Sequence, residues 1–285
     1  MKAALRILIV FSLVWSIART AIYLLPGDPA ESLVHESLVQ VSPEVLREKM
    51  GIPQHGWQRI FSFPQTHSLI RKESTFELVS NALSRSATLT FLTLLMSSII
   101  TCLMLYLSFR SAGAKTSLRI LSSISASIPL FVAGPLLLLI FCVWLKIFSP
   151  IESPFLPAVT LSFYLCGFWY RALGQKLDTY LPESSVSGAR SRGASEARVF
   201  FKNLLAPSLG SFLAYFGTQL GILLNGSLLV EIIFQWHGIG SLLAESVLSR
   251  DYPVIELCLF SVTLLSLLSQ QLGYFLQEAW EPKHQ

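Results

Sequence analysis

The residues best suited to a specific interaction lie in one short stretch, residues 187–198, where glycine, alanine and serine alternate with arginines. Glycine readily adopts a left-handed backbone, so Gly193 can end one helix. Ser195 can then cap the next helix, with Glu196 in its first turn. A helix–turn–helix with small side chains and a basic face suits docking of another protein surface. An ordinary positively charged loop is the alternative interpretation of this stretch.

Motifs that carry catalysis in other proteins do not occur in this sequence. It contains no G-x-x-x-x-G-K-[ST] phosphate loop, no H-E-x-x-H and no G-x-S-x-G. The five histidines lie outside the long apolar runs, and the three in the expected external loop (His35, His55 and His67) lack ligand-like spacing. The four cysteines form no C-x-x-C pair. We therefore expect a chain that is not an enzyme, with no metal site and no cofactor of its own.

The composition is that of a membrane protein. Hydrophobic residues make up 52% of the 285 residues, charged residues only 13%, and the mean hydropathy is +0.58. Soluble domains carry about 25% charged residues. The net charge of +4 is too small and too dispersed for a nucleic-acid interface. These values argue against a soluble enzyme, a nucleic-acid-binding protein and a disordered protein.

Six apolar runs predict an all-α integral membrane fold with six transmembrane helices. About 20 helical residues cross the hydrocarbon core, and a helix satisfies its own backbone hydrogen bonds there. Five charged residues fall within the runs: Arg6, Arg19, Arg171, Glu231 and Glu256. The first run could be a cleaved signal peptide, but no clear cleavage site follows, so we expect a retained helix. The runs are 4–25, 86–109, 120–145, 155–172, 207–234 and 254–276.

The distribution of lysine and arginine predicts that both termini are cytoplasmic. In that orientation the short external loops hold only Lys146 and Arg250. The internal segments then hold Lys2, Arg110, Lys115, Arg119, Lys176, Arg190, Arg192, Arg198, Lys202 and Lys283. The expected organisation is an N-terminal helix (1–25), an external loop (26–85), a five-helix core (86–276) and a cytoplasmic tail (277–285). The core contains one long cytoplasmic segment, 173–206.

Several motifs resemble the permease subunits of bacterial ABC importers, in the branch for dipeptides, oligopeptides and nickel. Residues 189–196 (ARSRGASE) are similar to the "ARAKGLSE" form of the family's EAA loop. The other matches are 25–30 (LPGDPA), 127–131 (SIPLF), 156–158 (LPA), 231–240 (EIIFQWHGIG) and 250–254 (RDYPV). Their order relative to the six runs extends the resemblance over nearly the whole chain.

The resemblance implies a permease in the bacterial inner membrane that imports peptides or a similar small solute. It also implies four kinds of partner: a second homologous permease, cytoplasmic ATPases that use ATP, an extracytoplasmic solute-binding protein and membrane lipid. No nucleic-acid partner is expected. The residues expected to dock on an ATPase are Ala189, Arg190, Arg192, Gly193, Ala194, Ser195 and Glu196. A self-contained secondary transporter or channel is the alternative, although internal repeats and midplane carboxylates typical of that class are not evident.

Polar residues of the fifth run are the candidates for a translocation path. Gln219 and Asn225 lie deeper in this run than Glu231 and are the better candidates to face a water-filled path. In one straight helix Glu231 would lie roughly 36 Å beyond Pro207, near the external interface. An interfacial charge is therefore the simpler interpretation of Glu231, Arg19 and Glu256, and Glu231 is kept as a third candidate for the path. The Gly217-x-x-x-Gly221 spacing predicts close packing of this helix against a neighbour.

Overall fold

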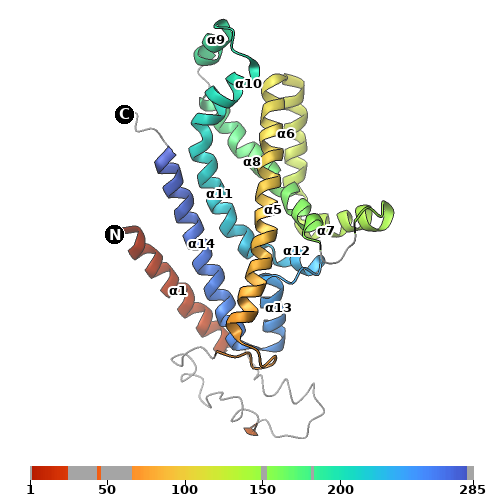
Figure 1. Cartoon of the computed structure of the whole chain (residues 1–285), viewed down its shortest axis with the longest axis vertical. Coiled ribbons are helices and arrows are strands. Elements are labelled where there is room, and N and C mark those ends of the chain that lie inside the picture. Colours follow the sequence, from red (N-terminus) through yellow and green to blue (C-terminus); the bar gives the residue numbers. More distant parts are fainter. Residues whose placement is uncertain (1, 25–43, 46–65, 149–152, 181–182, 281–285) are drawn as a thin grey trace. The chain divides into compact units, whose positions relative to one another are not determined.

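The computed structural model describes residues 2–24, 44–45, 66–148, 153–180 and 183–280, which contain helices and no β-strand. Residues 25–30 and most of the expected external loop and the end of the tail lie outside these ranges. The longer helices, shown in Figure 1, are α1 (Lys2–Leu24), α5 (Thr75–Arg110), α6 (Ala112–Ser127), α8 (Phe155–Tyr180), α11 (Ala206–Gly226), α13 (Ile239–Ser249) and α14 (Tyr252–Trp280). Shorter helices are α7 (Leu130–Leu138), α9 (Glu183–Ser191), α10 (Glu196–Arg198) and α12 (Leu228–Ile233), and two π-helical segments are η1 (Leu139–Trp144) and η2 (Val199–Leu205).

The expectation of an all-helical membrane fold is confirmed. Each predicted apolar run coincides with one helix or with consecutive helices. By length and composition, three described helices can cross a membrane: residues 75–110, 196–224 and 252–280. A bent pair, residues 112–127 with 130–144, makes a fourth candidate. Six spans therefore remain a prediction. Helix α5 begins at Thr75, inside the segment that was expected to be external loop.

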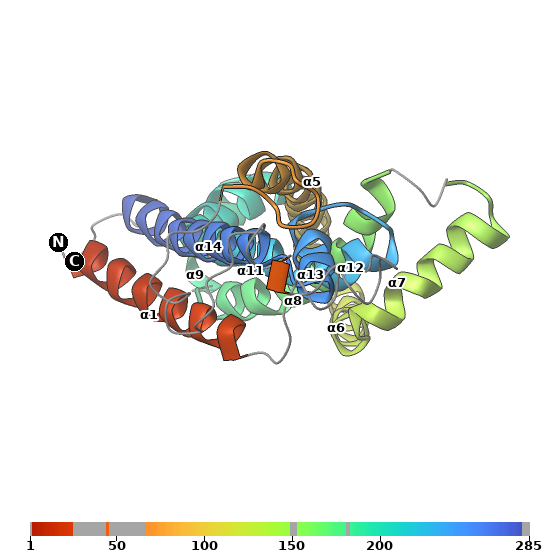
Figure 2. The same cartoon turned by 90° about the horizontal axis from the view of Figure 1, so that it is seen from below.

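A sharp bend interrupts the third apolar run, which was expected to be one continuous helix. The chain bends by 99° between α6 and the segment 130–144, which is α7 continued by η1, and Figure 2 shows α7 running away from the end of α6. Ile128, the residue before Pro129, has an extended backbone (φ −81°, ψ 117°). A proline disfavours helical backbone in the preceding residue and lacks an amide hydrogen itself, so the helix ends at Ser127.

The described chain forms two compact units. The first combines α1 and the start of α5 with α13 and the first part of α14, within residues 1–86 and 237–267. Its core joins Val79 and Ala82 of α5 to Ile239 of α13 and to Val254 and Cys258 of α14. The Ser86 hydroxyl of α5 also accepts a hydrogen bond of 2.8 Å from the Ile239 amide. This bond fixes the start of α13 against α5.

A buried aspartate organises the segment that precedes α5. Asp251 is 2% exposed and lies in the "RDYPV" stretch between α13 and α14. Its carboxylate accepts hydrogen bonds from the Ser68 hydroxyl and the Leu69 amide. Arg71 adds an ion pair of 2.6 Å to Glu245 of α13. Residues 68–71 are thereby held on the α13–α14 connection.

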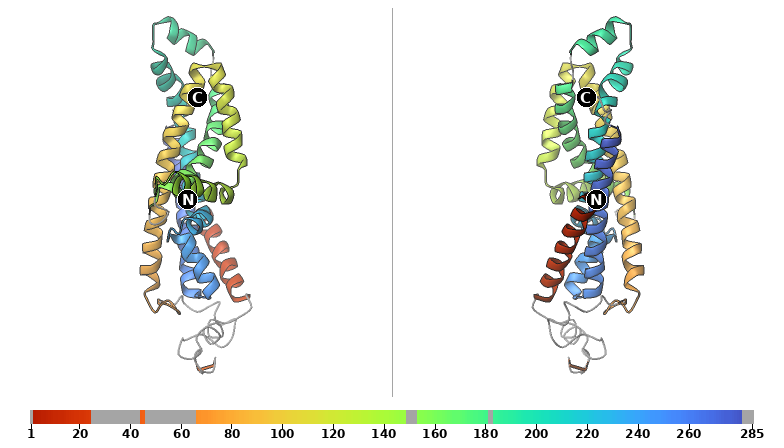
Figure 3. Two further views of the ribbon diagram at one scale, coloured as in Figure 1. Left: turned by 90° about the vertical axis from the view of Figure 1, so that its right-hand side faces the viewer. Right: turned by 90° about the vertical axis from the view of Figure 1, so that its left-hand side faces the viewer.

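The second unit contains the rest of α5 and α14 and all the elements from α6 to α12. The largest fully buried side chains of its core are Trp169 of α8 and Phe200 of η2, and most of the other core residues are aliphatic. Helices α6 and α8 are neighbours, with an ideal Cβ at Gly167 only 2.9 Å from the Ser122 carbonyl oxygen. The end of α5, the start of α6, α9 and α10 all lie at the same end of this unit (Figure 3). That end holds the candidate site.

Candidate functional site

A glycine turn separates α9 from α10. Gly193 has a left-handed backbone with φ of +77°. Its amide donates a hydrogen bond of 2.9 Å to the Arg190 carbonyl, and the Ala194 amide donates one of 3.2 Å to the Ala189 carbonyl. This pair of bonds is the Schellman motif, which satisfies the carbonyls that a helix end leaves without partners. The expectation that Gly193 ends one helix is confirmed.

Ser195 begins the next helix. Its backbone is extended (φ −65°, ψ 149°) and its side chain accepts a hydrogen bond from the Arg198 amide. This is the N-cap expected from the sequence, and Glu196 stands in the first turn that follows. Val199, the first residue of η2, is fully buried. The cap therefore sets the direction in which the chain leaves the turn and enters the core.

An ion pair closes the turn. The Arg190 Nε and Nη2 atoms each donate a hydrogen bond of 2.9 Å to the Glu196 carboxylate. The same guanidinium lies 5.3 Å from the ring centroid of Phe109, at the end of α5. The hydrogen bond to Glu196 raises the pKa of the Arg190 guanidinium above its ordinary value. Bidentate pairing and stacking on an aromatic ring are geometries that arginine provides and lysine does not.

The seven residues expected to dock on an ATPase differ in accessibility. Ala189 is 4% exposed and belongs to the core of the second unit, so little of its side chain is accessible to a partner. Ala194 packs partly against the same core. Arg190 and Glu196 are about half exposed but face each other. Arg192, Gly193 and Ser195 are exposed and form the accessible part of the turn.

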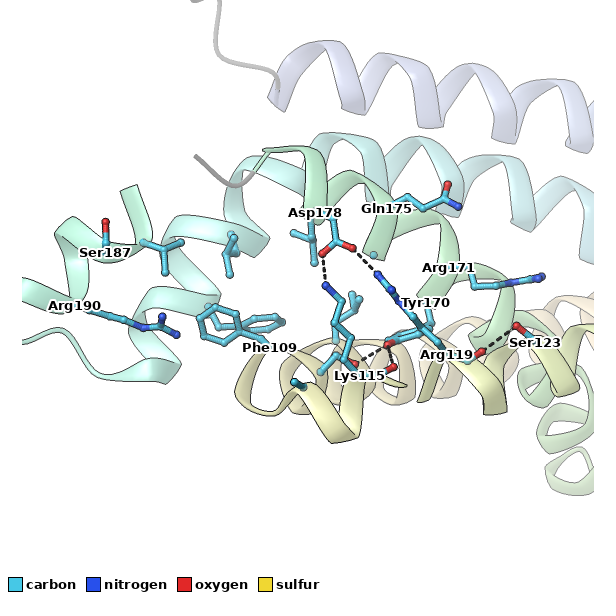
Figure 4. A pocket seen from close by; sticks show the side chains of 18 residues that line it. Phe109, Lys115, Arg119, Ser123, Tyr170, Arg171, Gln175, Asp178, Ser187 and Arg190 are labelled. Atoms are coloured by element: carbon cyan, nitrogen blue, oxygen red, sulfur yellow. Dashed lines mark hydrogen bonds and ion pairs between the residues drawn. The ribbon is translucent and has the colours of Figure 1, made fainter. Parts of the chain in front are cut away.

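Behind the turn lies a cavity of about 1050 Å³ between the ends of α5, α6, α8, α9 and η2 (Figure 4). Asp178 of α8 accepts hydrogen bonds from Lys115 at 2.6 Å and from Arg119 at 2.7 Å, both on α6. Arg171 lines the same cavity, and Arg190 stands at its other end beside Phe109.

Sequence reasoning missed this cavity. The i, i+4 spacing of Lys115 and Arg119 places both side chains on one face of α6. Their shared partner Asp178 follows Arg119 by 59 residues, so it is brought there by the packing of α6 on α8. No local sequence pattern connects the two elements.

The candidates for the translocation path lie in different surroundings. Gln219 is in the middle of α11 and is 8% exposed. Asn225 is in the last turn of α11, and its side chain falls outside what the structure describes. Glu231 is fully buried in α12, where its carboxylate accepts a hydrogen bond of 2.8 Å from the Ser227 hydroxyl. None of the three is placed in a path by these contacts.

The interfacial interpretation of Glu231 rested on a geometry that the structure does not have. It assumed one straight helix across residues 207–234, but α11 ends at Gly226 and α12 is a separate short helix. Helix α12 packs against α7, with the side chain of Ile233 at contact distance (3.4 Å) from an ideal Cβ at Gly134. Glu231 therefore lies inside the second unit instead of at an exposed helix end.

Arg19 and Glu256 also differ from the interfacial charges that were expected. Arg19 Nε lies 3.5 Å from Glu256 Oε1, with the side chains 11% and 4% exposed. The Arg19 guanidinium also lies 5.9 Å from the Trp15 ring centroid. Phe260 of α14 makes edge-to-face contacts with Phe11 and Trp15 of α1. Within the first unit these groups join α1 to α14.

The close helix packing predicted at Gly217 is present. An ideal Cβ at this glycine would lie 2.5 Å from the Gly273 Cα and 2.7 Å from the Ser269 carbonyl oxygen. Both of these residues are in α14. Helices α11 and α14 therefore cross in near backbone contact, which only glycine permits.

These features define the class of protein. Three described helices are long and apolar enough to cross a membrane, and the α9–α10 turn lies at one end of the second unit. Residues 103–284 match the family "Binding-protein-dependent transport system inner membrane component". The chain belongs to this family. It is thus an inner-membrane component of the transport machinery rather than a catalytic enzyme.

Two relatives extend the similarity to almost the full length. The nickel import system permease protein NikB of Staphylococcus aureus strain MRSA252 is 28% identical over 295 aligned residues, which cover 98% of this chain and 89% of the relative. NikB of strain USA300 is 29% identical over 271 residues, which cover 90% and 83%. The chain is therefore homologous to permeases of ABC importers, as its motifs implied.

Proposed function

We propose that this chain is one of two permease subunits of an ABC importer and that residues 184–205 dock on a cytoplasmic ATPase subunit. The second permease completes the translocation path, and an extracytoplasmic binding protein delivers the solute. In this proposal both termini are cytoplasmic, as the distribution of lysine and arginine predicts.

One observation carries the proposal. The α9–α10 turn is fixed by three independent devices: the left-handed Gly193, the Ser195 cap and the Arg190–Glu196 pair. A loop that merely connects two spans needs none of them. The exposed part of the turn is small and basic, and its far side is continuous with the core through Ala189 and Val199. A rigid protrusion attached to the core can transmit a displacement, whereas a flexible loop would absorb it.

Coupling follows from this rigidity. ATP-driven closure of the ATPase pair would move the docked turn, and η2 would transmit the movement to α11. Because η2 continues directly into α11, a shift of the turn changes the position of the helix that carries Gln219. Alternating access then arises from two discrete arrangements of the helices, whose equilibrium ATP shifts from a distance.

The solute is proposed from the relatives. Those named above are nickel import permeases, so nickel is the first solute to test and a dipeptide is the second. Uptake of each radiolabelled solute should be measured in cells that contain this chain with its partner subunits. Uptake that requires the ATPase subunits supports the proposal. Uptake that persists after ATP depletion and follows an imposed ion gradient would instead identify a secondary transporter.

The docking element is tested separately from the solute. Deletion of residues 188–198, or Gly193→Pro, should abolish uptake while the chain still inserts into the membrane, because both changes destroy the turn. Proline cannot adopt a φ of +77° and removes the amide that bonds to the Arg190 carbonyl. Unchanged uptake and unchanged co-purification of ATPase subunits with these variants would disprove the docking assignment.

A further inference from the structure

The cavity behind the turn has more basic than acidic groups in its lining. Two cations, Lys115 and Arg119, share the single carboxylate of Asp178, which leaves one positive charge in excess. Arg171 adds a second, since no acidic side chain among the described residues pairs with it. Arg190 is balanced by Glu196. The lining therefore carries a surplus of two positive charges, which suits a phosphate ester.

We propose that this cavity binds the phosphate headgroup of an anionic phospholipid. The inference rests on the membrane location of the family and on the cavity itself, not on the docking of an ATPase. Basic cavities between transmembrane helices bind phospholipid headgroups through the same combination of arginine and lysine donors. Arginine also matches phosphate oxygens with paired hydrogen-bond donors.

The position of the cations agrees with a headgroup. Arg119 lies seven residues after Ala112, the first residue of α6, hence about 10 Å from that helix end. A bilayer adds roughly 5 to 8 Å of polar headgroup region to each side of its hydrocarbon core. The long arginine side chains can extend toward that region from slightly deeper positions. In the proposed orientation the start of α6 lies on the cytoplasmic side, and from there the cations can reach the phosphates of lipids.

The remaining walls accommodate the apolar part of a lipid. Leu105, Phe109, Leu177, Val186, Phe200 and Leu204 line the cavity beside the charged groups. A volume of about 1050 Å³ has room for a glycerophosphate group and the first carbons of its chains. Tyr170 adds a phenolic hydroxyl, which lies 2.6 Å from the Ser108 hydroxyl and 3.5 Å from the Lys115 carbonyl oxygen.

An occupant would touch both the helix pair and the turn. Lys115, Arg119 and Asp178 belong to α6 and α8, whereas Val186 and Arg190 belong to α9. A bound headgroup therefore bridges the two parts through shared contacts. Anionic lipid would favour one position of α9 relative to α6 and α8, because ligand binding stabilises the arrangement that it contacts.

The test is a lipid titration of the purified full-length chain, with bound lipid counted by native mass spectrometry. Phosphatidylglycerol is compared with phosphatidylcholine, whose headgroup has no net charge. The wild-type chain should bind phosphatidylglycerol at least about tenfold more tightly. Each cation near a membrane surface contributes enough that Arg171→Gln should weaken this binding about fivefold, and Arg119→Gln with Arg171→Gln about thirtyfold.

Two further variants sharpen the result. Asp178→Asn removes the one carboxylate of the lining and should strengthen phosphatidylglycerol binding. Arg110→Gln removes a nearby exposed cation that does not line the cavity, and this variant should bind phosphatidylglycerol as tightly as the wild type. Phosphatidylcholine binding monitors folding in every variant. If the double variant does not fold, the single variant Arg171→Gln still tests the proposal, because Arg171 is exposed and its replacement should not disturb the core.

Three outcomes decide whether the proposal holds and whether the bound phosphate belongs to a lipid or to a soluble metabolite. Equal affinity for the two lipids, or phosphatidylglycerol affinity unaffected by Arg171→Gln and by the double variant, would overturn it. If millimolar glycerol 3-phosphate displaces the lipid, the recognised group is a phosphate that a soluble metabolite can also supply. If glycerol 3-phosphate fails to displace the lipid while the variants weaken binding, the lipid itself is the ligand.

Discussion

Arg190 and Glu196 are joined by two hydrogen bonds of 2.9 Å across the turn at Gly193, so the charges of the basic turn are directed partly at each other. Side chains that pair with each other in this way stabilise the conformation of the turn and are less available for contacts with a partner protein. Of the seven residues expected to dock, Arg192, Gly193 and Ser195 remain free of core packing and accessible. Substitutions in the Arg190–Glu196 pair should therefore act on the shape of the turn, whereas substitutions at the accessible residues can also act on contacts with a partner.

Exchanging the two charges tests whether the pair shapes the turn. Arg190→Glu and Glu196→Arg should each lower solute uptake, because like charges then oppose each other across the turn. The double exchange restores an ion pair and should recover a large part of the uptake. Uptake by the double exchange no better than by either single variant would show that each side chain contacts a partner on its own.

Substitutions at Gly193 should follow the cost of a left-handed backbone. No atom lies within 4 Å of an ideal Cβ at this position, so crowding plays no part. Alanine should destabilise the turn by about 1 kcal/mol, asparagine by less and valine by more. ATP-dependent uptake in membranes with equal amounts of protein should decline in the order Gly, Asn, Ala, Val. A decline that follows side-chain size at an unchanged turn conformation would contradict this reasoning.

Gly217→Ala should separate α11 from α14 near Gly273. The added methyl group would lie 2.5 to 2.8 Å from backbone atoms, which cannot move as a flexible side chain does. Overpacking of this kind costs about 1 to 3 kcal/mol. Gly113→Ala is the matched control, because its Cβ would meet only the Ser111 hydroxyl at 3.8 Å. Thermal unfolding of both purified variants should show a lowered midpoint for the first alone.

Glu231 should tolerate loss of its charge better than loss of its hydrogen bond. The substitution Glu231→Gln keeps a side-chain oxygen that can accept from the Ser227 hydroxyl, whereas Glu231→Ala leaves that buried hydroxyl without this acceptor. The alanine variant should be less stable by about 2 kcal/mol. Folded protein recovered after solubilisation measures the difference. Full recovery of Glu231→Gln with abolished uptake would instead support a direct function in the translocation path.

Breaking the pair between α1 and α14 should be more harmful than replacing it. Arg19→Leu or Glu256→Leu alone leaves one buried charge, at a cost of about 3 to 5 kcal/mol. The double replacement by leucine removes both charges and should be closer to the wild type. Protease resistance of the chain in native membranes reports this order. Additive losses in the double variant would show that the two residues act independently.

The sequence was most informative where structure is set locally. Gly193 and Ser195 adopt the predicted turn and cap because glycine chemistry and serine capping act within a few residues. Gly217 was identified by its spacing alone, although its contact with Gly273 comes from a distant part of the sequence. In each case the side chain, or its absence, determines what the backbone can do.

The predictions were wrong where the surroundings of a residue depend on segments that are distant in the sequence. The apolar run 120–145 contains Pro129, and the restriction that proline places on Ile128 could have predicted the bend. For Glu231 hydropathy alone gave no warning, because the end of α11 and the packing of α12 on α7 are tertiary features. The Arg19–Glu256 pair and the cation cluster at Asp178 likewise join residues that only the packed helices bring together.

The central claim is that the turn contacts an ATPase subunit, and photo-crosslinking tests it most directly. A benzophenone amino acid replaces Arg192 in the turn or, as a control, Leu248, which is 84% exposed at the end of α13. Native membranes are irradiated and the crosslinked proteins are identified by mass spectrometry. The account predicts an ATPase adduct from position 192 and none from position 248. No adduct at 192, or equal adducts at both positions, would contradict it.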